Sequence, residues 1–321
     1  NIPRREMVLA VLEELKDVPD RNIVIVAACG NHTPCTVESL NLGGDLQSRF
    51  RIVIHDSMAR EQMVFIGKTN AGTEVKINRA VAEADVKVLI GQIKPHYFTG
   101  YSGGAKSILP GVSAFSTITV NHLMKSLPGA ALGKVDGNPV RSDMEEGARM
   151  AGQLFVLNIV MNQQREVVRA VAGDVVAAHR EGVVWARKVC EVPSPKADIV
   201  VASDSLPVSM DLYQASKLVA PAALVLKSGG VVILAAECHE GVGPLNVVNH
   251  VVYKMGLCQA LPADHRILLV SSLTKETVAE TYCEYSPGVD GALETARNHV
   301  GPGAETLIMP RAGLLVPIPQ A

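Results

Sequence analysis

The stretch VKVLIGQIKPHYFTGYSGGAKSILPG, residues 86–111, joins an apolar strand pattern to a glycine-rich turn. Its first eight residues are typical of a buried strand, and glycines follow at Gly100, Gly103, Gly104 and Gly111. A glycine-rich turn at the carboxyl end of a strand presents backbone N–H groups where an anion can bind. The stretch therefore predicts an α/β fold with a ligand site at the edge of a sheet.

Strand patterns alternate with helical patterns on both sides of this stretch. Residues 191–196 (EVPSPK) hold two prolines and little apolar periodicity, which is typical of a linker. The sequence thus predicts two α/β domains, 1–192 and 193–305, with an active-site crevice between them and a tail of about 306–321 that packs back on the first. The predicted strands are 22–28, 51–54, 86–93, 155–161, 198–202, 230–236, 266–271 and 306–309; the predicted helices are 7–15, 143–151, 211–223, 246–255 and 289–299, with a hairpin turn at 69–72.

The composition excludes several classes of protein. The chain has 321 residues, enough for two domains, and its 30 basic and 32 acidic residues leave a net charge of −2. This balance argues against a nucleic-acid-binding protein, and 48% apolar residues exclude disorder. The most apolar stretch, 218–236, is interrupted by Pro221 and Lys227, so no membrane span is expected. Six scattered cysteines indicate reduced thiols in a cytoplasmic protein.

The glycine-rich loop has two interpretations from its residues alone. A phosphate-binding P-loop beginning at Gly100 would need a second glycine where Ala105 stands, although a lysine and a serine follow. Pro110 would also stop the helix that a P-loop opens. A structural glycine-rich connection is the other interpretation, and it leaves His96 and Lys106 unexplained. A nucleotide-binding phosphotransferase therefore stays open as an alternative function.

A second cluster, Cys29-Gly-Asn-His32-Thr-Pro-Cys35, follows the strand at 22–28. Its Cys-x2-His-x2-Cys spacing invites a zinc interpretation, but structural zinc needs four ligands and no partner pair is evident. A single histidine on a loop at the carboxyl edge of the strand is the simpler interpretation of His32. His122, taken alone, is more typical of a packing residue.

A third group lies on one face of a predicted helix start. Tyr213, Gln214 and Lys217 are spaced three and four residues apart, so their side chains are neighbours. Alone, this pattern is typical of a solvated helix that Asp211 caps.

Together, these residues resemble the lactate racemase family, whose enzymes carry a nickel-pincer nucleotide. The loop from His96 to Lys106 and the DLYQxxK helix are the specific parts of the resemblance. The matching stretches lie in order over nearly the whole chain, at 30–34, 53–56, 75–85, 95–111, 121–122, 136–139, 172–174 and 211–217.

The resemblance implies a racemase or epimerase of a small, lactate-like 2-hydroxy acid. The implied cofactor is pyridinium-3,5-bisthiocarboxylic acid mononucleotide with Ni(II), the nickel-pincer nucleotide. It implies that hydride leaves the substrate carbon and returns to its other face while a base takes the hydroxyl proton, which avoids a costly carbanion. The implied partners are the substrate and the cofactor-synthesis enzymes, with no nucleic acid and no membrane.

The resemblance also assigns roles to single residues. Lys106 corresponds to the lysine that bonds to the cofactor through a thioamide, and His122 corresponds to the protein ligand of the nickel. His32 and His96 correspond to two acid/base histidines, one for each face of the substrate, a role that suits the near-neutral pKa of imidazole.

Two further sets of residues complete the predicted site. The second domain would send three side chains toward cofactor and substrate, namely Tyr213, Gln214 and Lys217. Loop chemistry predicts that backbone amides receive the nucleotide phosphate at Ser102, Gly103 and Gly104.

One family element is not found in this sequence. An Asp-x-Thr-Arg element, whose arginine is expected to hold the substrate carboxylate, would fall just before Asn1. Two explanations stay open: the sequence is a fragment, or the substrate is bound differently, with Arg4 or Arg5 in place of that arginine. A non-catalytic carrier of nickel or cofactor is therefore a third open function.

Overall fold

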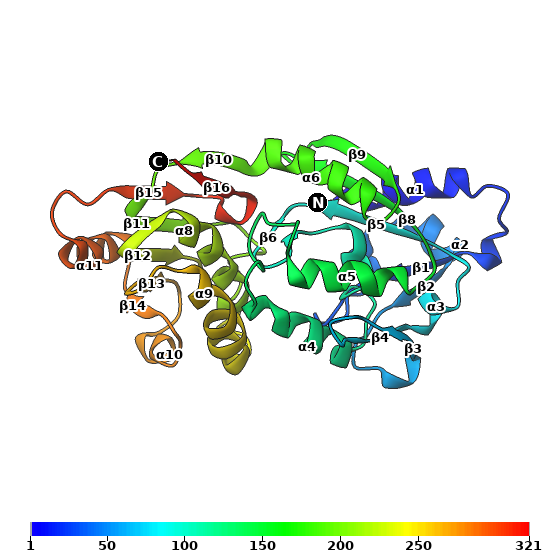
Figure 1. The fold of residues 1–321 in the computed structure, drawn as a ribbon, viewed down its shortest axis with the longest axis horizontal. Helices are drawn as coiled ribbons and strands as arrows, with labels where there is room; N and C mark the ends of the chain where they lie inside the picture. The colour runs from blue at the N-terminus through cyan, green and yellow to red at the C-terminus, as the bar shows by residue number, and fades with distance from the viewer. Residues whose placement is uncertain (1, 321) are drawn as a thin grey trace. The chain divides into compact units, whose positions relative to one another are not determined.

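The computed structural model describes residues 2–320, which form two compact units (Figure 1). The first unit comprises residues 2–94, Tyr101–Ala130 and Val135–Val189. The second comprises Pro95–Gly100, Ala131–Lys134 and residues 190–320. The two short segments of the second unit are therefore surrounded in sequence by the first unit, an arrangement that the sequence analysis did not predict.

The second unit is built on five parallel strands, in the order β14-β13-β12-β11-β15. Alternate residues of β11, an interior strand, enter two apolar clusters: Ile199 and Val201 pack on one face, and Val200 and Ala202 on the other. Burial of both faces explains why the strand reads as an unbroken apolar run. The bounds are β11 (Ala197–Ser203), β12 (Leu226–Ala235), β13 (Arg266–Val270), β14 (Glu284–Ser286) and β15 (Thr306–Met309).

Helices of the second unit cover both faces of this sheet. Ala292 and Ala296 of α11 (Val289–Val300) join one apolar cluster, and α8 (Val219–Val225) joins the other. The helix predicted at 211–223 is divided into α7 (Leu212–Ala215), a 3-10 turn and α8. The helix predicted at 246–255 is a π-helical segment, Val247–Leu257, followed by α9 (Cys258–Ala260). The remaining helix is α10 (Lys275–Ala279).

The end of the chain departs from the sequence-based expectation. The tail that was expected to return to the first domain instead pairs in the second unit, where the apolar β15 lies beside β11. The predicted linker contains a strand, β10 (Glu191–Ser194), which pairs in parallel with β16 (Val316–Pro319). Proline is tolerated there because β10 has one strand neighbour only.

The first unit contains smaller sheets. The predicted strand β5 (Val86–Ile93) pairs in parallel with β8 (Gln153–Met161), which pairs antiparallel with β9 (Val167–Gly173). The hairpin turn predicted at 69–72 is confirmed, because it joins the antiparallel strands β3 (Met63–Lys68) and β4 (Glu74–Asn78). The other strand pairs are β1 (Val24–Ala27) with β2 (Arg51–Ile54), and β6 (Pro95–His96) with β7 (Gly100–Tyr101).

Six helices of the first unit accompany these strands in the described part of the chain. The predicted helices at 7–15 and 143–151 correspond to α1 (Arg4–Glu14) and α5 (Pro139–Arg149). The others are α2 (Gly44–Arg49), α3 (Arg79–Ala82), α4 (Phe115–Leu123) and α6 (Ala177–Cys190). The α/β class predicted from the sequence is therefore confirmed. Within residues 2–320, no helix combines the length and apolar character that crossing a membrane requires.

Helix α6 packs closely on the β5-β8-β9 sheet at Gly182. A Cβ atom at this position would lie 2.2 Å from Cδ1 of Ile93 and 3.1 Å from Cγ2 of Val171. Ile93 is itself buried, so it has little room to move. The helix and the sheet can therefore approach this closely only because residue 182 has no side chain.

We expect Gly182→Ala to destabilise the protein although alanine favours helices. Overpacking costs about 1–3 kcal/mol, which exceeds the gain in helix propensity of about 1 kcal/mol. Gly291→Ala in α11 is the matched control, because its Cβ would meet no atom closer than 3.7 Å. Thermal unfolding should show a lower midpoint for Gly182→Ala and an unchanged or higher one for Gly291→Ala. Equal midpoints would contradict the packing argument.

Candidate active site

Lys106 lies in a short 3-10 turn, Gly104–Ser107, beyond the carboxyl end of β5. A P-loop would continue from its lysine into a helix. Here the next helix, α4, begins only at Phe115. The P-loop interpretation is therefore wrong, and with it the basis for a phosphotransferase.

Two of the three amides that were expected to bind phosphate, those of Ser102 and Gly104, have partners inside the protein. The N–H of Ser102 donates to Lys94 O at 2.8 Å, and the N–H of Gly104 donates to Asn158 Oδ1 at 2.7 Å. A Cβ on Gly103 would lie 2.6 Å from Asn158 Oδ1, and one on Gly104 would lie 3.0 Å from ring atoms of His179. These glycines therefore allow the loop to pack closely. The N–H groups of Ser102 and Gly104 are engaged in hydrogen bonds within the protein.

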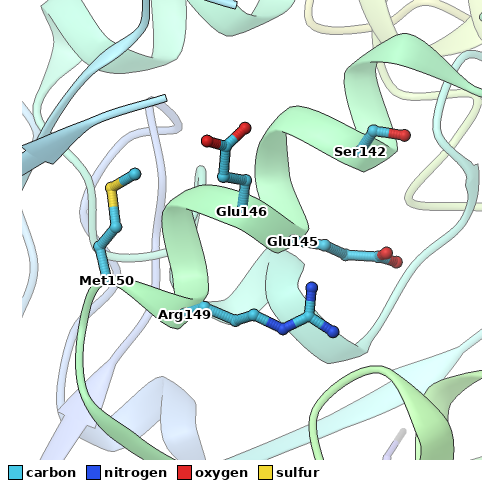
Figure 2. Close-up of a pocket in the computed structure, with 5 residues that line it drawn as sticks. All are labelled: Ser142, Glu145, Glu146, Arg149 and Met150. Carbon is cyan, nitrogen blue, oxygen red and sulfur yellow. The ribbon is translucent and has the colours of Figure 1, made fainter. Parts of the chain in front are cut away.

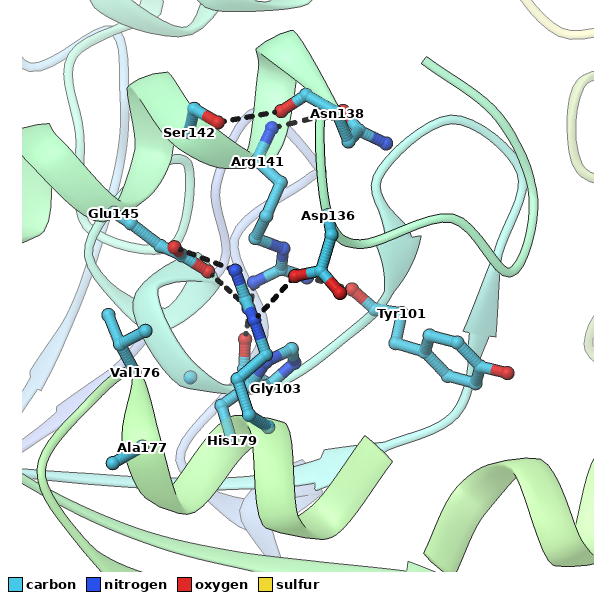
Figure 3. A network of polar contacts seen from close by, with 12 residues as sticks. Tyr101, Gly103, Asp136, Asn138, Arg141, Ser142, Glu145, Val176, Ala177 and His179 are labelled. Carbon is cyan, nitrogen blue, oxygen red and sulfur yellow. Dashed lines mark hydrogen bonds and ion pairs between the residues drawn. The ribbon is translucent and has the colours of Figure 1, made fainter. Parts of the chain in front are cut away.

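Arg141, on α5, fixes this loop from a fully buried position (Figure 3). Its guanidinium donates to Gly103 O at 3.2 Å and to Tyr101 O. Burial lowers the pKa of Arg141 to about 10, so it stays charged at neutral pH. Arg141 was not among the residues predicted from the sequence. The one indication of its role was its place just after the helix start at Asn138, whose side chain caps α5.

A second helix holds the same loop, as Figure 3 shows. His179 of α6 is fully buried, and its Nε2 lies 2.9 Å from Ser102 O. Because a carbonyl only accepts, Nε2 carries the hydrogen. Arg180 joins the two helices through an ion pair with Glu145 at 2.7 Å and a second with Asp136 at 3.3 Å.

His122 lies within electrostatic range of three titratable side chains, those of Lys106, Lys125 and His32. Burial lowers the pKa of His122 well below its ordinary value, and the charges of Lys106, Lys125 and His32 lower it further. Such interactions weaken with distance, so each of the three acts on His122 from its surroundings. His32, Lys106 and His122 of the predicted site all belong to the first unit, and burial favours the neutral form of the His122 imidazole.

Lys125 is a member of this group that the sequence analysis missed. It follows α4, three residues after His122, and is only 5% exposed. Burial lowers its pKa to about 8. The spacing from His122 was the available signal, but lysine is rarely buried, so the pattern alone favours a solvated residue.

The loop that carries His32 places two thiols in contact. The sulfur atoms of Cys29 and Cys35 are 3.5 Å apart, and His32 is exposed. Among residues 2–320, no group of three or more histidine, cysteine or acidic side chains is arranged to hold a metal ion. The zinc interpretation therefore gains no support.

His96 lies in the second unit, within the short segment Pro95–Gly100. Its ring stacks on Tyr97 with centroids 5.3 Å apart and meets Phe98 edge-on at 4.7 Å. The N–H of Thr99 donates to His96 Nδ1 at 3.4 Å. In the neutral ring, the proton is therefore on Nε2.

The predicted group on the 211–217 segment is also assembled in the second unit. Lys217 Nζ donates to Gln214 Oε1 at 2.6 Å and lies 4.8 Å from the centre of the Tyr213 ring. Asp211 caps α7 by accepting from the Gln214 N–H at 2.6 Å, as expected. Tyr213 and Tyr97, the neighbour of His96, both pack against the same apolar cluster of the second unit.

The arginines considered as substrate anchors differ in their surroundings. Arg5 forms a two-pronged ion pair with Asp45, at 2.8 and 2.9 Å, and also donates to Leu42 O. Arg4 is exposed on α1. Arg5 is thus committed to a structural contact.

A surface hollow of the first unit lies along α5, away from these residues (Figure 2). None of the predicted site residues lines it. Glu145 is held there by Arg180, and Glu146 accepts from the Asn70 N–H at 2.9 Å. The residues that line this hollow are Ser142, Glu145, Glu146, Arg149 and Met150.

Comparison with known proteins places the chain in a family. The model of the lactate racemase N-terminal domain matches residues 1–133, and that of the lactate racemase C-terminal domain matches residues 192–257. The lactate racemase of Thermoanaerobacterium thermosaccharolyticum is 30% identical over 96% of this chain and 80% of its own length. The lactate racemase of Lactiplantibacillus plantarum is 29% identical, with the same coverage of 96% and 80%.

Solved structures agree with this placement. The lactate racemase apoprotein of Thermoanaerobacterium thermosaccharolyticum has a TM-score of 0.91 and 28% identity, covering 100% of this chain and 84% of its own. A Thermotoga maritima protein has a TM-score of 0.72 at 16% identity, over 92% of this chain and 86% of its own, and shares the fold. The chain therefore belongs to the lactate racemase family, and it is an enzyme of the isomerase class.

We expect Arg141→Met to loosen the glycine-rich loop. The change leaves two buried carbonyl groups without donors, at about 1–3 kcal/mol each, so the free energy of unfolding should fall by roughly 2–6 kcal/mol. Arg49→Met is the control, because Arg49 pairs with Asp20 at the exposed surface, where an ion pair contributes little to stability. Denaturant unfolding and hydrogen exchange of residues 101–111 measure both effects. Unchanged exchange in Arg141→Met would refute the anchoring role.

Two buried imidazoles predict that stability falls in acid. Burial lowers the pKa of His55 and of His179 below the ordinary value of 6.5, so the unfolded chain takes up protons first. Their stabilising effect is complete above pH 6.5 and is lost as the pH falls toward the folded-state values, by up to about 1.4 kcal/mol per pH unit for each group. Urea unfolding is measured from pH 7.5 to 5.5. The free energy of unfolding should fall less steeply in His179→Gln, which keeps an N–H donor, than in the wild type. Equal slopes in the two proteins would contradict the pH effect assigned to His179.

Proposed function

We propose that this enzyme racemises or epimerises a small 2-hydroxy acid, using a nickel-pincer nucleotide attached to Lys106. Membership of the lactate racemase family supports the reaction class. One structural observation carries the assignment of the site: the lysine proposed for cofactor attachment and one proposed acid/base histidine both lie within electrostatic range of the proposed nickel ligand. Lys106, His32 and His122 fill these roles.

The donor set around His122 fits a metal that arrives with ligands of its own. Among residues 2–320, no group of three or more histidine, cysteine or acidic side chains could hold a metal ion, and one neutral imidazole nitrogen would be a suitable protein ligand for nickel. The bound group would supply a hydride acceptor. Lys106 would tether it, and the neutral state of His122, which burial and nearby cations favour, leaves a lone pair for the metal.

Proton transfer at the substrate hydroxyl is assigned to two imidazoles. His32 is exposed on its loop, where it can reach a small molecule. His96, with the proton of its neutral ring on Nε2, is arranged as a proton donor. Removal of the hydroxyl proton by one imidazole and its return by the other let either enantiomer serve as substrate.

The charged head of the substrate is assigned to the second unit. Lys217 is held between the Gln214 carbonyl and the Tyr213 ring, so its ammonium group is oriented. An oriented ammonium with an adjacent amide suits a carboxylate. Lys125 adds a buried cation to the His122 neighbourhood in the first unit. The enzymes that make the cofactor are the expected partners of this protein.

The test of cofactor attachment is the intact mass of protein produced together with cofactor-synthesis enzymes and nickel. We expect a covalent adduct in the wild type and none in Lys106→Arg, which keeps the charge but cannot form the thioamide. Lys68→Arg, on an exposed strand end, is the matched control and should carry the adduct. A wild-type chain that stays unmodified would refute the proposed attachment.

The reaction itself is tested by chiral chromatography with a panel of 2-hydroxy acids. We expect inversion in D2O without deuterium entering the substrate carbon, because hydride is stored and returned rather than exchanged as a proton. Deuterium at that carbon would refute hydride transfer. An adduct and nickel without turnover of any hydroxy acid would identify a non-catalytic carrier instead.

A further inference from the structure

The carboxamide of Asn121 is oriented by two acceptors beside His122. Asn121 is fully buried on α4, and its Nδ2 donates to Asp143 Oδ2 at 2.8 Å and to Val140 O at 3.3 Å. A flipped amide would place its oxygen against both acceptors, so the orientation is settled. Its Oδ1 therefore faces His122 Nδ1, at 3.2 Å.

This orientation determines which nitrogen of His122 carries the hydrogen. The amide oxygen only accepts, so Nδ1 of His122 is the donor and Nε2 of the neutral ring carries no hydrogen. We propose that Asn121 and Asp143 are positioning residues that hold His122 as the Nδ1–H tautomer, in which Nε2 is the nitrogen that would bind the metal. The tautomer is derived from the hydrogen bonds alone, whereas its use rests on the nickel role proposed above for His122.

Asp143 is itself anchored to a separate element. Its Oδ1 accepts from Thr69 Oγ1 at 2.5 Å, and its Oδ2 accepts from Thr73 Oγ1 at 2.9 Å. The two threonines bracket the turn between β3 and β4, and the N–H of Thr73 donates to Thr69 Oγ1 at 3.1 Å. All three side chains are at most 4% exposed.

The result is a buried chain of hydrogen bonds from the hairpin turn to the imidazole. Every partner of the Asp143 carboxylate is a donor, so the carboxylate is a fixed acceptor at the start of the chain. Partners that orient a metal-bound histidine in this way set its tautomer and basicity, and their loss costs about 10- to 100-fold in metal affinity or activity. We expect losses of that order for Asn121→Ala and Asp143→Ala.

The direct test is nitrogen-15 NMR of imidazole-labelled protein without cofactor, with the His122 signals assigned from His122→Gln. We expect a protonated Nδ1 and an unprotonated Nε2 in the wild type. In Asn121→Ala and Asp143→Ala, the proton should move in part or fully to Nε2, the usual site in a free ring. Asp143→Asn retains an acceptor for Asn121 and should restore the wild-type pattern.

Asn78→Ala controls for the loss of a buried asparagine, because Asn78 is 2% exposed and caps α3 through the Ala80 N–H. It should lower the unfolding midpoint and leave the His122 tautomer unchanged. A wild-type ring protonated on Nε2, or the wild-type tautomer in both alanine variants, would overturn the positioning role. Should one alanine variant fail to fold, the other decides.

Nickel retention separates this inference from the proposed function. Protein produced with cofactor-synthesis enzymes and nickel is dialysed, and its metal content is measured. A 10- to 100-fold weaker retention in Asn121→Ala, recovered in Asp143→Asn relative to Asp143→Ala, supports both claims. A wild type that binds no nickel while the tautomer responds as expected supports the positioning role and refutes the metal role of His122. Equal retention in all variants overturns the positioning of the metal ligand.

Discussion

The buried guanidinium of Arg141 is the constraint on which the glycine-rich loop depends. A tight turn of this kind directs carbonyl groups inward, where no strand partner can donate to them, and buried carbonyl groups need donors. Arginine supplies several donors from one planar group, and Arg141 gives them to Tyr101 O and Gly103 O. The position of Lys106 follows, because it lies in the turn that these bonds hold.

Helix α5 serves the site twice. Arg141 and Asp143 are two residues apart, so their side chains leave the helix in different directions. One reaches the loop that carries Lys106, and the other reaches Asn121 beside His122. A single buried helix thus sets the relative places of the lysine and the imidazole, and Asn138 at its start fixes where the helix begins.

Strands buried on both faces could be predicted from the sequence, because both of their faces are apolar. β11, predicted at 198–202, spans Ala197–Ser203, and its residues alternate between two apolar clusters. Helix ends were less predictable, because they depend on tertiary contacts. The same holds for β10 in the predicted linker, because its pairing depends on β16, which lies far away in the sequence. Tertiary pairing, rather than local pattern, also decides that β15 belongs to the second sheet.

Site residues could be predicted only where the residue type itself indicates a chemical role, as for histidine and for a lysine in a glycine-rich loop. Histidines 32, 96 and 122 and Lys106 stand out in a sequence, and the structure groups three of these four in one unit. Arg141 and Lys125 could not be found in this way, because charged residues are ordinarily exposed. The role of the glycine-rich turn could not be predicted for a related reason: its sequence is the same whether its amides bind an anion or oxygen atoms of the protein, as those of Ser102 and Gly104 do.

The chain passes several times between the two units, and this limits how recombination can exchange parts of the gene. The chain passes from one unit to the other after residues 94, 100, 130, 134 and 189. Tyr97 and Leu132, on the two short excursions, cover the apolar cluster of the second unit. No single breakpoint in the gene separates the two units, so one crossover cannot exchange either of them as an intact module.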